Sequence, residues 1–271
     1  MSFMTVDLEK CNKDGICVDE CPMKIIYMDG DEPKLLPGGA KMCIRCGHCV
    51  AVCPTAALCI GDIKPEDCLE IDNNLKLDPV SAEQFLRSRR SIRTYKDKPV
   101  EKETLEKLID IACHAPSGHN SQSVKWQVVY DREEVKRYSG MVVDWMRHMI
   151  KEQPDFAKSL HLDLVVAGWD FGMDTVSRDA QHLILANGHK KNIMGKVSCT
   201  IAMTYLELAL PAFGLGGCWN GFFNAAAMSW PPLQEALGLG DDLNHAVMMV
   251  GHPKYRYRRM SPRNNADITW K

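Results

Sequence analysis

The spacing of apolar residues divides the chain into two parts. Beyond residue 80, apolar side chains recur at helical spacing, and in segment 101–113 Leu105, Leu108, Ile109 and Ala112 share one helical face. The small apolar residues of 198–213 predict a buried helix that ends before the glycines of 214–217. Short apolar and β-branched runs predict four strands. These runs are 124–130, 164–167, 182–186 and 246–250.

Residues 1–62 lack this periodicity and are instead dense in cysteine. Segment 63–80 mixes Pro, Asn and Asp with few periodic apolar residues, which is typical of a linker. Ser81 and Gln84 then form a capping-box pattern ahead of an apolar pair. We therefore expect a small domain over 1–62, a linker over 63–80, and a larger layered domain of helices and strands over 81–271.

Composition excludes several classes of protein. The chain has 271 residues, 45% hydrophobic and 25% charged, which is ordinary for a globular protein. No run approaches the ~18–20 apolar residues that span a membrane, and the N-terminus shows no secretion signal, so we expect a cytoplasmic protein with no membrane partner. The net charge of −2 argues against nucleic acid as the main partner.

Cysteine carries the first chemical signal. Seven of the 12 cysteines lie between residues 11 and 53, and clustered thiols in a reducing compartment indicate metal ligands rather than disulfides. Three thiolates at i, i+3 and i+6 followed by a Cys-Pro pair are typical of a [4Fe–4S] loop whose fourth cysteine serves the other cluster. That crossing rule predicts two ligand sets. One is Cys21, Cys43, Cys46 and Cys49, and the other is Cys11, Cys17, Cys53 and whatever occupies position 14.

Position 14 is aspartate, at the three-residue step that a cysteine would occupy. A carboxylate is a hard, exchangeable ligand on a soft thiolate site, so ligation by Asp14 predicts a loosely held iron and a 3Fe form on oxidation. The alternative is that Asp14 is a solvated loop residue and water fills that corner. The spacing leaves both open.

A structural zinc site is the simplest alternative for clustered cysteines, but it does not need seven of them in two proline-terminated runs. The cysteines outside the pattern are expected to be small buried hydrophobic residues. They are Cys59, Cys68, Cys113, Cys199 and Cys218.

Three polar segments mark the larger part of the chain. Segment 87–93 holds four arginines with serines between them, a pattern suited to a phosphate. Segment 115–122 (APSGHNSQ) offers small residues, backbone amides and an amide side chain, and segment 254–263 holds five basic residues. Taken singly, each has a simpler interpretation: a solvated face, an ordinary turn, or a nucleic-acid patch.

Residues 1–62 resemble bacterial two-cluster ferredoxins. Residues 81–271 resemble the nitroreductase family of FMN-dependent flavoproteins, on RRSIR at 89–93, APSGHNSQ at 115–122, GLGGCWNGF at 214–222 and GHPKYRYRRMSPR at 251–263. The resemblance implies an α+β chain: a ferredoxin-like iron–sulfur domain followed by a three-layer α/β/α sandwich. It also implies an intertwined homodimer with two FMN sites, each built from both chains.

The resemblance further implies which residues bind FMN. Arg89, Ser91, Arg93 and Arg259 would contact the phosphate and ribityl chain, with Arg90 contributing its backbone. Trp219, Asn220 and Gly221 would present backbone groups near the ring. Ser117, Gly118 and Asn120, flanked by Pro116 and Gln122, match a stretch supplied by the partner subunit. No catalytic side chain is implied, and His182 is expected to be structural.

These expectations give one function and one alternative. The leading hypothesis is an oxidoreductase in which two [4Fe–4S] clusters feed electrons to FMN. The FMN in turn reduces a small electron-poor acceptor such as a nitroaromatic compound or a quinone. The electron donor is left open between NAD(P)H and an external ferredoxin. The alternative is a non-enzymatic electron carrier or redox sensor.

Overall fold

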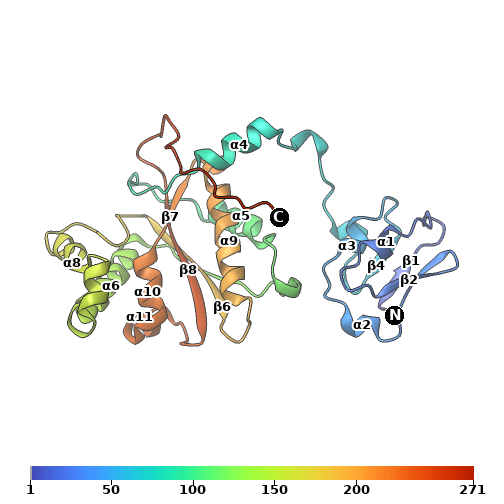
Figure 1. Ribbon diagram of the computed structural model, residues 1–271, viewed down its shortest axis with the longest axis horizontal. Helices are drawn as coiled ribbons and strands as arrows, with labels where there is room; N and C mark the ends of the chain where they lie inside the picture. The colour runs from blue at the N-terminus through green and yellow to red at the C-terminus, as the bar shows by residue number, and fades with distance from the viewer. Residues whose placement is uncertain (1) are drawn as a thin grey trace. The chain divides into compact units, whose positions relative to one another are not determined.

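The computed structural model describes residues 2–271, which form two compact units. The first unit comprises residues up to Lys76 together with His119–Ser121, and the second comprises Leu77–Gly118 and Gln122–Lys271 (Figure 1). Within the described residues, no helix is both long enough and apolar enough to cross a membrane. The predicted domain limits of 1–62, 63–80 and 81–271 stay a prediction.

The first unit contains two short two-stranded antiparallel sheets and three one-turn helices. Strand β1 (Met4–Val6) pairs antiparallel with β4 (Leu58–Ile60), and β2 (Ile26–Asp29) pairs with β3 (Glu32–Leu35). The helices are α1 (Ile16–Asp19), α2 (Gly39–Met42) and α3 (His48–Ala51). Its small core includes three of the predicted ligand cysteines, because their thiols face inward with Ile25 and Leu58. The core is therefore built around the cysteine loops.

Two 3₁₀ turns, η1 (Pro65–Asp67) and η2 (Asn73–Leu75), precede α4 (Pro79–Ser88). The capping box predicted at Ser81 is wrong. The cap is Asp78, whose carboxylate accepts hydrogen bonds from the backbone amides of Val80 and Ser81 at 2.9 and 3.1 Å. Pro79 at the first helical position suits this start, since its missing N–H would be unsatisfied there in any case.

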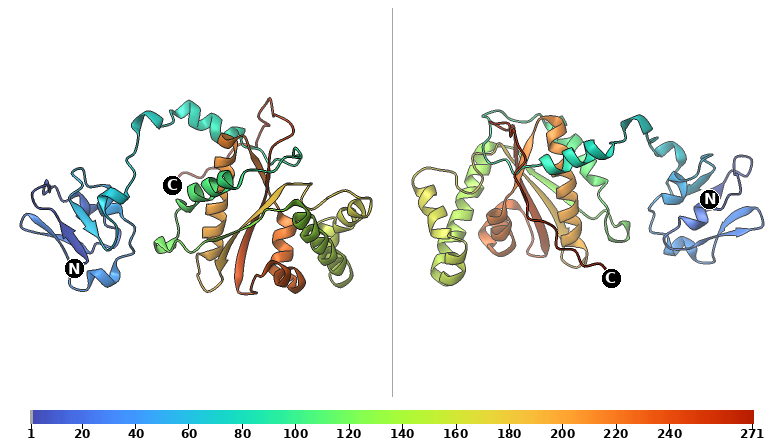
Figure 2. Two further views of the ribbon diagram at one scale, coloured as in Figure 1. Left: turned by 180° about the vertical axis from the view of Figure 1, so that it is seen from behind. Right: turned by 45° about the horizontal axis from the view of Figure 1, so that its top comes forward.

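The second unit is a four-stranded antiparallel sheet with helices on both faces (Figure 2). The strand order is β5-β6-β8-β7. The strands are β5 (Lys125–Val129), β6 (His182–His189), β7 (Gly216–Trp219) and β8 (Leu243–Gly251). The strands predicted at 124–130, 182–186 and 246–250 are thus present. The three-layer α/β/α arrangement expected from the resemblance is also present.

Alternation along the central strands divides the core in two. Leu183 and Leu185 of β6 point into one cluster, while Ile184 and Ala186 point into the other. Helices α5 (Lys102–Cys113) and α9 (Gly195–Ala209) cover the second face, and α9 continues into the 3₁₀ turn η4 (Leu210–Phe213). Because both faces of the sheet are buried, the central strands contain continuous apolar runs, at 183–186 in β6 and 246–250 in β8.

The opposite face is covered by α6 (Arg132–Glu152), α10 (Gly221–Ser229) and α11 (Pro231–Leu237), with α7 (Pro154–Ser159) and α8 (Leu162–Asp170) beside α6. The strand predicted at 164–167 is wrong, because these residues lie within α8. Four apolar residues of this segment recur at helical spacing and pack on the core: Leu162, Val165, Val166 and Trp169. The predicted run of four residues was too short to distinguish a strand from a helix by sequence alone, and tertiary packing favours the helix.

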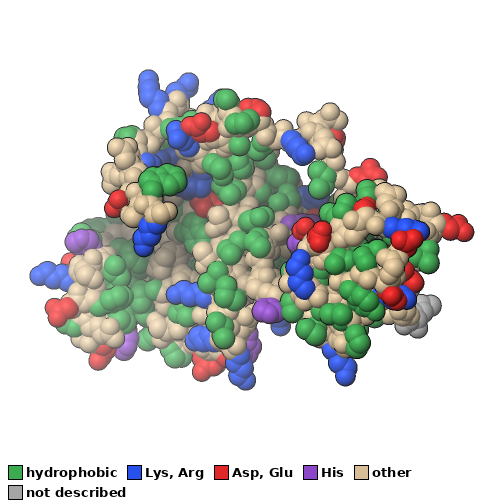
Figure 3. All heavy atoms as spheres, turned by 45° about the vertical axis from the view of Figure 1, so that its right-hand side comes forward, with side chains coloured by type: hydrophobic (Ala, Val, Ile, Leu, Met, Phe, Trp, Pro, Cys, Tyr) green, Lys and Arg blue, Asp and Glu red, His purple; other side chains and the backbone are tan. Residues whose placement is uncertain are grey.

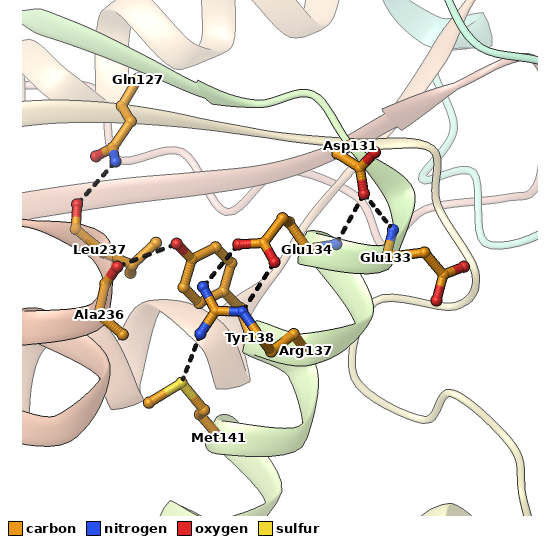
Figure 4. Close-up of polar contacts among 9 residues, drawn as sticks. All are labelled: Gln127, Asp131, Glu133, Glu134, Arg137, Tyr138, Met141, Ala236 and Leu237. Atoms are coloured by element: carbon orange, nitrogen blue, oxygen red, sulfur yellow. Dashed lines mark hydrogen bonds and ion pairs between the residues drawn. The ribbon is translucent and has the colours of Figure 1, made fainter.

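The N-terminal end of α6 is fixed by polar contacts (Figure 4). The carboxylate of Asp131 accepts hydrogen bonds from the amides of Glu133 and Glu134, at 2.8 and 3.1 Å. The hydroxyl of Tyr138 donates to the carbonyl of Ala236 at 3.0 Å, which joins α6 to the end of α11. This layer therefore has a well-defined capping residue and a tertiary anchor.

His182 is structural, as expected. Its Nε2 accepts a hydrogen bond from the Val100 amide at 2.9 Å, and its Nδ1 lies 2.7 Å from the Tyr130 carbonyl. Burial lowers its pKa. Among the non-motif cysteines, Cys199 and Cys218 are buried, but Cys113 is exposed at the end of α5, so the expectation that all five are buried is wrong.

Candidate functional site

The two cysteine loops of the first unit share a backbone pattern. Lys13 and Arg45 both have left-handed φ values, of 60° and 52°, and so do Gly15 and Gly47, at 71° and 73°. This conformation turns successive amides toward one point, which makes an anion-binding concavity of the kind found at iron–sulfur sites. The amides of Lys13 and Arg45 each donate to the cysteine sulfur two residues earlier, at 3.4 Å.

One cavity, of about 310 Å³, is lined by all four cysteines of the first predicted set, Cys21, Cys43, Cys46 and Cys49. Its other walls are mostly apolar, including Ile25, Ile26 and Ile60. Burial and, secondarily, the charges of the other three cysteines together raise the pKa of Cys49 to about 12. The four thiols are thus close enough to repel one another as thiolates. This is the donor set that a [4Fe–4S] cluster requires.

A second cavity, of about 350 Å³, is lined by Cys11, Asp14, Cys17 and Cys53, the other predicted set. Burial raises the pKa of Cys17, and the charges of Cys11 and Cys53 add to the effect. The donor chemistry fits an iron–sulfur cluster with one non-thiolate corner. Within residues 2–271, no group of three or more His, Cys, Asp or Glu side chains is arranged to hold a single metal ion.

Asp14 borders its cavity from an exposed position. Its Oδ1 accepts a hydrogen bond from the Ile16 amide at 3.2 Å, which leaves the other carboxylate oxygen uncommitted. The negative charge of Asp14 acts to raise the pKa of the Cys53 thiol, although the overall shift of that pKa is downward. Burial of Cys53 is opposed by hydrogen bonds from the Ala57 amide and from Thr55. Ligation of iron by Asp14 stays a prediction.

In the second unit, segment 89–93 lies against strand β7. The Ile92 amide donates to the Gly217 carbonyl at 2.9 Å, and a Cβ on Gly216 would lie 2.3 Å from Ile92 Cγ1. Glycine at 216 is therefore required for this close approach. The contact places the arginine segment beside the GGCW strand, although the two are far apart in sequence.

An open cavity of about 820 Å³ adjoins β7 and brings together Arg93, Trp219 and Gly221 of the predicted site. Arg178 borders the same cavity. Arg93 and Arg178 also border a neighbouring polar cavity of about 930 Å³. Neither arginine forms a salt bridge with any residue in 2–271, so their charge remains available to an anion.

The positive charge of these two arginines also affects the pKa of the Cys218 thiol. Burial raises the pKa of Cys218, while the positive charges of Arg93 and Arg178 and a hydrogen bond with Ser91 act in the opposite direction. Ser91 therefore also reaches β7. Arg90 stacks its guanidinium over the ring of Tyr257, 5.6 Å from the centroid, and Arg259 lies exposed in the C-terminal segment outside both cavities.

Asn220 is engaged inside the protein. Its Oδ1 caps α10 by accepting from the Phe223 amide at 3.1 Å, and its Nδ2 donates to the Ser177 hydroxyl at 3.3 Å. Its own amide donates to the Val247 carbonyl at 2.9 Å. The neighbouring Trp219 and Gly221 border the cavity. The side-chain and backbone N–H groups of Asn220, by contrast, already donate hydrogen bonds within the protein.

The third predicted segment lines a different cavity, of about 410 Å³. Pro116, Ser117 and Gln122 border it together with residues of α5 and α9. The Ser117 hydroxyl accepts a hydrogen bond from the Gln122 amide at 3.0 Å. Gly118 and Asn120 belong to the short turn η3 (Gly118–Asn120), in which Asn120 is left-handed, with φ of 52°. Within one chain, these residues are not brought to the cavity of Arg93.

Sequence reasoning missed one charged residue of this region, Glu207, and noted a second, Arg178, near the expected flavin site without assigning it a contact. Glu207, on α9, lies in an otherwise apolar run, and that isolated carboxylate was an available signal. Arg178 follows α8 in a loop where Arg178 and Asp179 are both left-handed, with φ of 57° and 54°. The sequence gives no clear signal for these two left-handed conformations, because neither residue is glycine.

Comparison with known proteins agrees with these observations. Residues 86–252 match the family model described as "Nitroreductase family". The chain belongs to the nitroreductase family. Residues 3–72 of this nitroreductase-family chain match the model described as "4Fe-4S dicluster domain". The fold resembles a nitroreductase with bound FMN from Bacteroides fragilis, with a TM-score of 0.60 and 15% identity, over 72% of this chain and 100% of that one.

Two curated relatives are similar to separate parts of the chain. The FMN reductase [NAD(P)H] of Bacillus subtilis is 31% identical over 134 residues, covering 48% of this chain and 50% of the relative. A protein named "Ferredoxin 7Fe", from Hydrogenibacillus schlegelii, is 40% identical over 55 residues, covering 20% of this chain and 67% of the relative. The nitroreductase-family unit thus follows a ferredoxin unit in one chain.

Proposed function

We propose that this chain is an FMN-dependent oxidoreductase whose ferredoxin unit supplies electrons to the flavin, and that it reduces an electron-poor acceptor such as a nitroaromatic compound or a quinone. The observation that carries the proposal is the pairing, in one chain, of two thiol-lined cavities with a basic cavity beside β7. FMN, when bound, exchanges electrons singly or in pairs, so it links one-electron clusters to two-electron organic chemistry.

The first unit binds the clusters through its two ligand sets. Cys21, Cys43, Cys46 and Cys49 hold one [4Fe–4S] cluster in an apolar cavity. Cys11, Cys17, Cys53 and Asp14 would hold the other in a more polar cavity, where the Asp14 carboxylate would be a weaker ligand for iron than the three thiolates. The backbone amides of Lys13 and Arg45 stabilise thiolate charge by hydrogen bonding to sulfur. The similarity to a 7Fe ferredoxin supports the second assignment.

The second unit binds FMN beside β7. Arg93 and Arg178 supply positive charge for an anionic group, and Trp219 and Gly221 border the same cavity. Arg89, Arg90, Ser91 and Arg259 complete the proposed phosphate and ribityl contacts. Arginine suits this role because its guanidinium stays charged and donates several hydrogen bonds in a fixed geometry. The FMN named for a relative and for a structural neighbour supports this choice of cofactor.

A homodimer is part of the proposal. Five residues would complete the FMN site of the partner subunit: Pro116, Ser117, Gly118, Asn120 and Gln122. Within their own chain, Pro116, Ser117 and Gln122 border a cavity separate from that of Arg93. NAD(P)H or an external ferredoxin would be the electron donor. The name of the Bacillus subtilis relative supports NAD(P)H. A cytoplasmic location follows from the need for reduced thiols.

The test uses full-length protein purified and reconstituted without oxygen. We expect FMN and enough iron and sulfide for two clusters per chain, and turnover with a nitroaromatic compound or a quinone. Cys46→Ser removes a ligand of one cluster and should slow flavin reduction by reduced ferredoxin at least tenfold. Cys59→Ser, at a partly exposed cysteine of the same unit that borders neither cavity, is the matched control.

Protein that retains no FMN, or that turns over no acceptor when fully reduced, would contradict the proposal and favour a non-enzymatic electron carrier. Equal rates of flavin reduction in Cys46→Ser and the wild type would show that electrons bypass the clusters. Reduction of the flavin by NADPH that is equally fast in Cys46→Ser and in the wild type would lead to the same conclusion for that donor.

A further inference from the structure

One buried carboxylate joins two residues of the proposed flavin site. Oε1 of Glu207 accepts a hydrogen bond from Arg89 Nη1 at 2.8 Å, and its Oε2 accepts one from Trp219 Nε1 at 2.9 Å. The side chain of Glu207 is 8% exposed and that of Arg89 is 28% exposed. Both carboxylate oxygens are therefore used, each by a residue from a different part of the fold.

The three residues belong to separate segments. Glu207 lies in the last turns of α9, Arg89 directly follows α4, and Trp219 ends β7. Trp219 borders the cavity that also contains Arg93 and Arg178. One side chain thus connects the arginine segment to the edge of the cavity. The neighbouring α9 residues Met203 and Leu206 pack on the sheet, whereas Glu207 hydrogen-bonds to Arg89 and Trp219.

A carboxylate in this position is costly unless it is paired and hydrogen-bonded. The pairing has two consequences for its partners. It restricts the rotamers of Arg89 and Trp219, which otherwise have freedom as partly exposed side chains. The pairing also offsets the charge of Arg89. Only one guanidinium nitrogen of Arg89, Nη1, donates to Glu207, so its other N–H groups can donate to a ligand.

We propose that Glu207 is a positioning residue that fixes Arg89 and Trp219 for FMN. This inference rests on the proposed function, since it assigns Glu207 a role toward the same cofactor. Pre-ordered side chains lose less entropy when a ligand binds, so the pairing strengthens FMN binding. Glu207 itself contacts the cofactor only through its two partners.

The test measures FMN binding to apoprotein by quenching of FMN fluorescence. Glu207→Gln keeps one acceptor oxygen and loses the charge, and we expect FMN to bind at least tenfold more weakly. Glu83→Gln is the matched control, because Glu83 forms an exposed ion pair with Arg87 at 2.7 Å, and it should change the dissociation constant less than twofold. Binding by Glu207→Gln that is unchanged or tighter overturns the proposal.

A double-mutant cycle distinguishes positioning from general destabilisation. In a Trp219→Phe background, Glu207→Gln should weaken FMN binding by less than in the wild type, because one of its two partners is already gone. Fully additive effects would show that Glu207 does not act through Trp219. Each variant is compared by circular dichroism, and a conservative Glu207→Asp variant covers the case in which the amide does not fold.

A readout without FMN separates this inference from the proposed function. The indole N–H of Trp219, assigned by its loss in Trp219→Phe, should shift and exchange faster with solvent in Glu207→Gln. Wild-type apoprotein that fails to bind FMN refutes the proposed function, yet the indole signal still reports whether Glu207 holds Trp219. An indole signal that does not respond to the substitution overturns the positioning role itself.

Discussion

Asp14 and Cys46 occupy equivalent positions in the two cysteine loops. Each follows a left-handed residue, Lys13 or Arg45, and each precedes a left-handed glycine. Each also borders a cavity lined by three other predicted ligands. The two loops therefore present a carboxylate and a thiol from the same place on the same backbone.

Asp14→Cys should convert the polar cavity into an all-cysteine site. We expect the iron at that corner to be retained on oxidation, because thiolate is a softer ligand for iron than carboxylate. Electron paramagnetic resonance should show loss of the 3Fe signal from the oxidised protein, and in the reduced protein one altered cluster signal and one unchanged signal. Asp29→Cys, which adds an exposed thiol away from both cavities, is the control. A spectrum identical to the wild type would show that position 14 lies outside the coordination sphere.

Hydrogen bonds to sulfur differ between the two cavities. The sulfur of Cys53 receives the Ala57 amide at 3.3 Å and lies 3.7 Å from the Thr55 hydroxyl. Thr55→Val should lower the reduction potential of the Asp14 cluster, because the hydroxyl stabilises the more negative, reduced state. A bond stronger by about 1.4 kcal/mol in that state corresponds to about 59 mV for one electron.

A potentiometric titration followed by electron paramagnetic resonance checks this shift. The cluster in the apolar cavity serves as an internal reference, and its potential should stay constant. Thr5→Val, at an exposed position on β1, should leave both potentials unchanged. A rise in potential, or an equal shift of both clusters, would be inconsistent with a hydrogen bond from Thr55 to Cys53.

The two ligand sets could be predicted from sequence because short spacing largely determines loop geometry. Cys43, Cys46 and Cys49 are three residues apart, so one loop can present all three. Strands β5, β6 and β8 were also predictable, since each contains a short run of apolar residues. Helix α8 was not, because a four-residue apolar run has the same appearance in a buried strand and in a helix.

The flavin-site contacts depend on distant pairs that no local pattern determines. Glu207 meets Arg89 across 118 positions of sequence, and that meeting requires the final packing of α9. Arg178 reaches the same cavity as Arg93 only because its loop adopts two consecutive left-handed residues. The resemblance suggested Arg89 and Trp219 separately, but the carboxylate that connects them became visible only in the fold.

Arg93→Gln should weaken FMN binding by about tenfold or more, equivalent to losing one charged hydrogen bond of about 1.5–3 kcal/mol. Arg93 borders the cavities of about 820 and 930 Å³ in the second unit and forms no salt bridge with any residue in 2–271. Titration of apoprotein with FMN at two salt concentrations measures the effect. Higher salt should reduce the difference between variant and wild type, because screening weakens exposed charge.

Arg147→Gln is the control for Arg93→Gln. Arg147 lies on α6 and is already paired with Asp144 at 2.7 Å, outside both cavities. Its replacement should leave FMN affinity unchanged. An Arg93 variant that binds FMN as tightly as the wild type would place the anionic group elsewhere.

The stability of the second unit should fall in mildly acidic solution because of His245. Burial lowers the pKa of His245 to about 4, and the charge of Lys190 contributes in the same direction. Its Nδ1 donates to Asn187 Oδ1 at 2.8 Å across β6 and β8, and Nε2 is buried without a partner. The folded state therefore favours neutral imidazole, whereas the unfolded chain takes up a proton near pH 6.5.

Since the unfolded state binds more protons, the stability contribution is full above about pH 6.5 and is lost as the pH falls toward 4. We expect the free energy of unfolding to drop by about 2 kcal/mol between pH 7 and pH 5 through this residue. Urea unfolding followed by tryptophan fluorescence reports the second unit, because all six tryptophans lie between residues 126 and 270. His245→Gln should flatten this pH dependence, and His114→Gln, at an exposed position, should not. An equal slope in His245→Gln and the wild type would mean that His245 takes up its proton without unfolding the sheet.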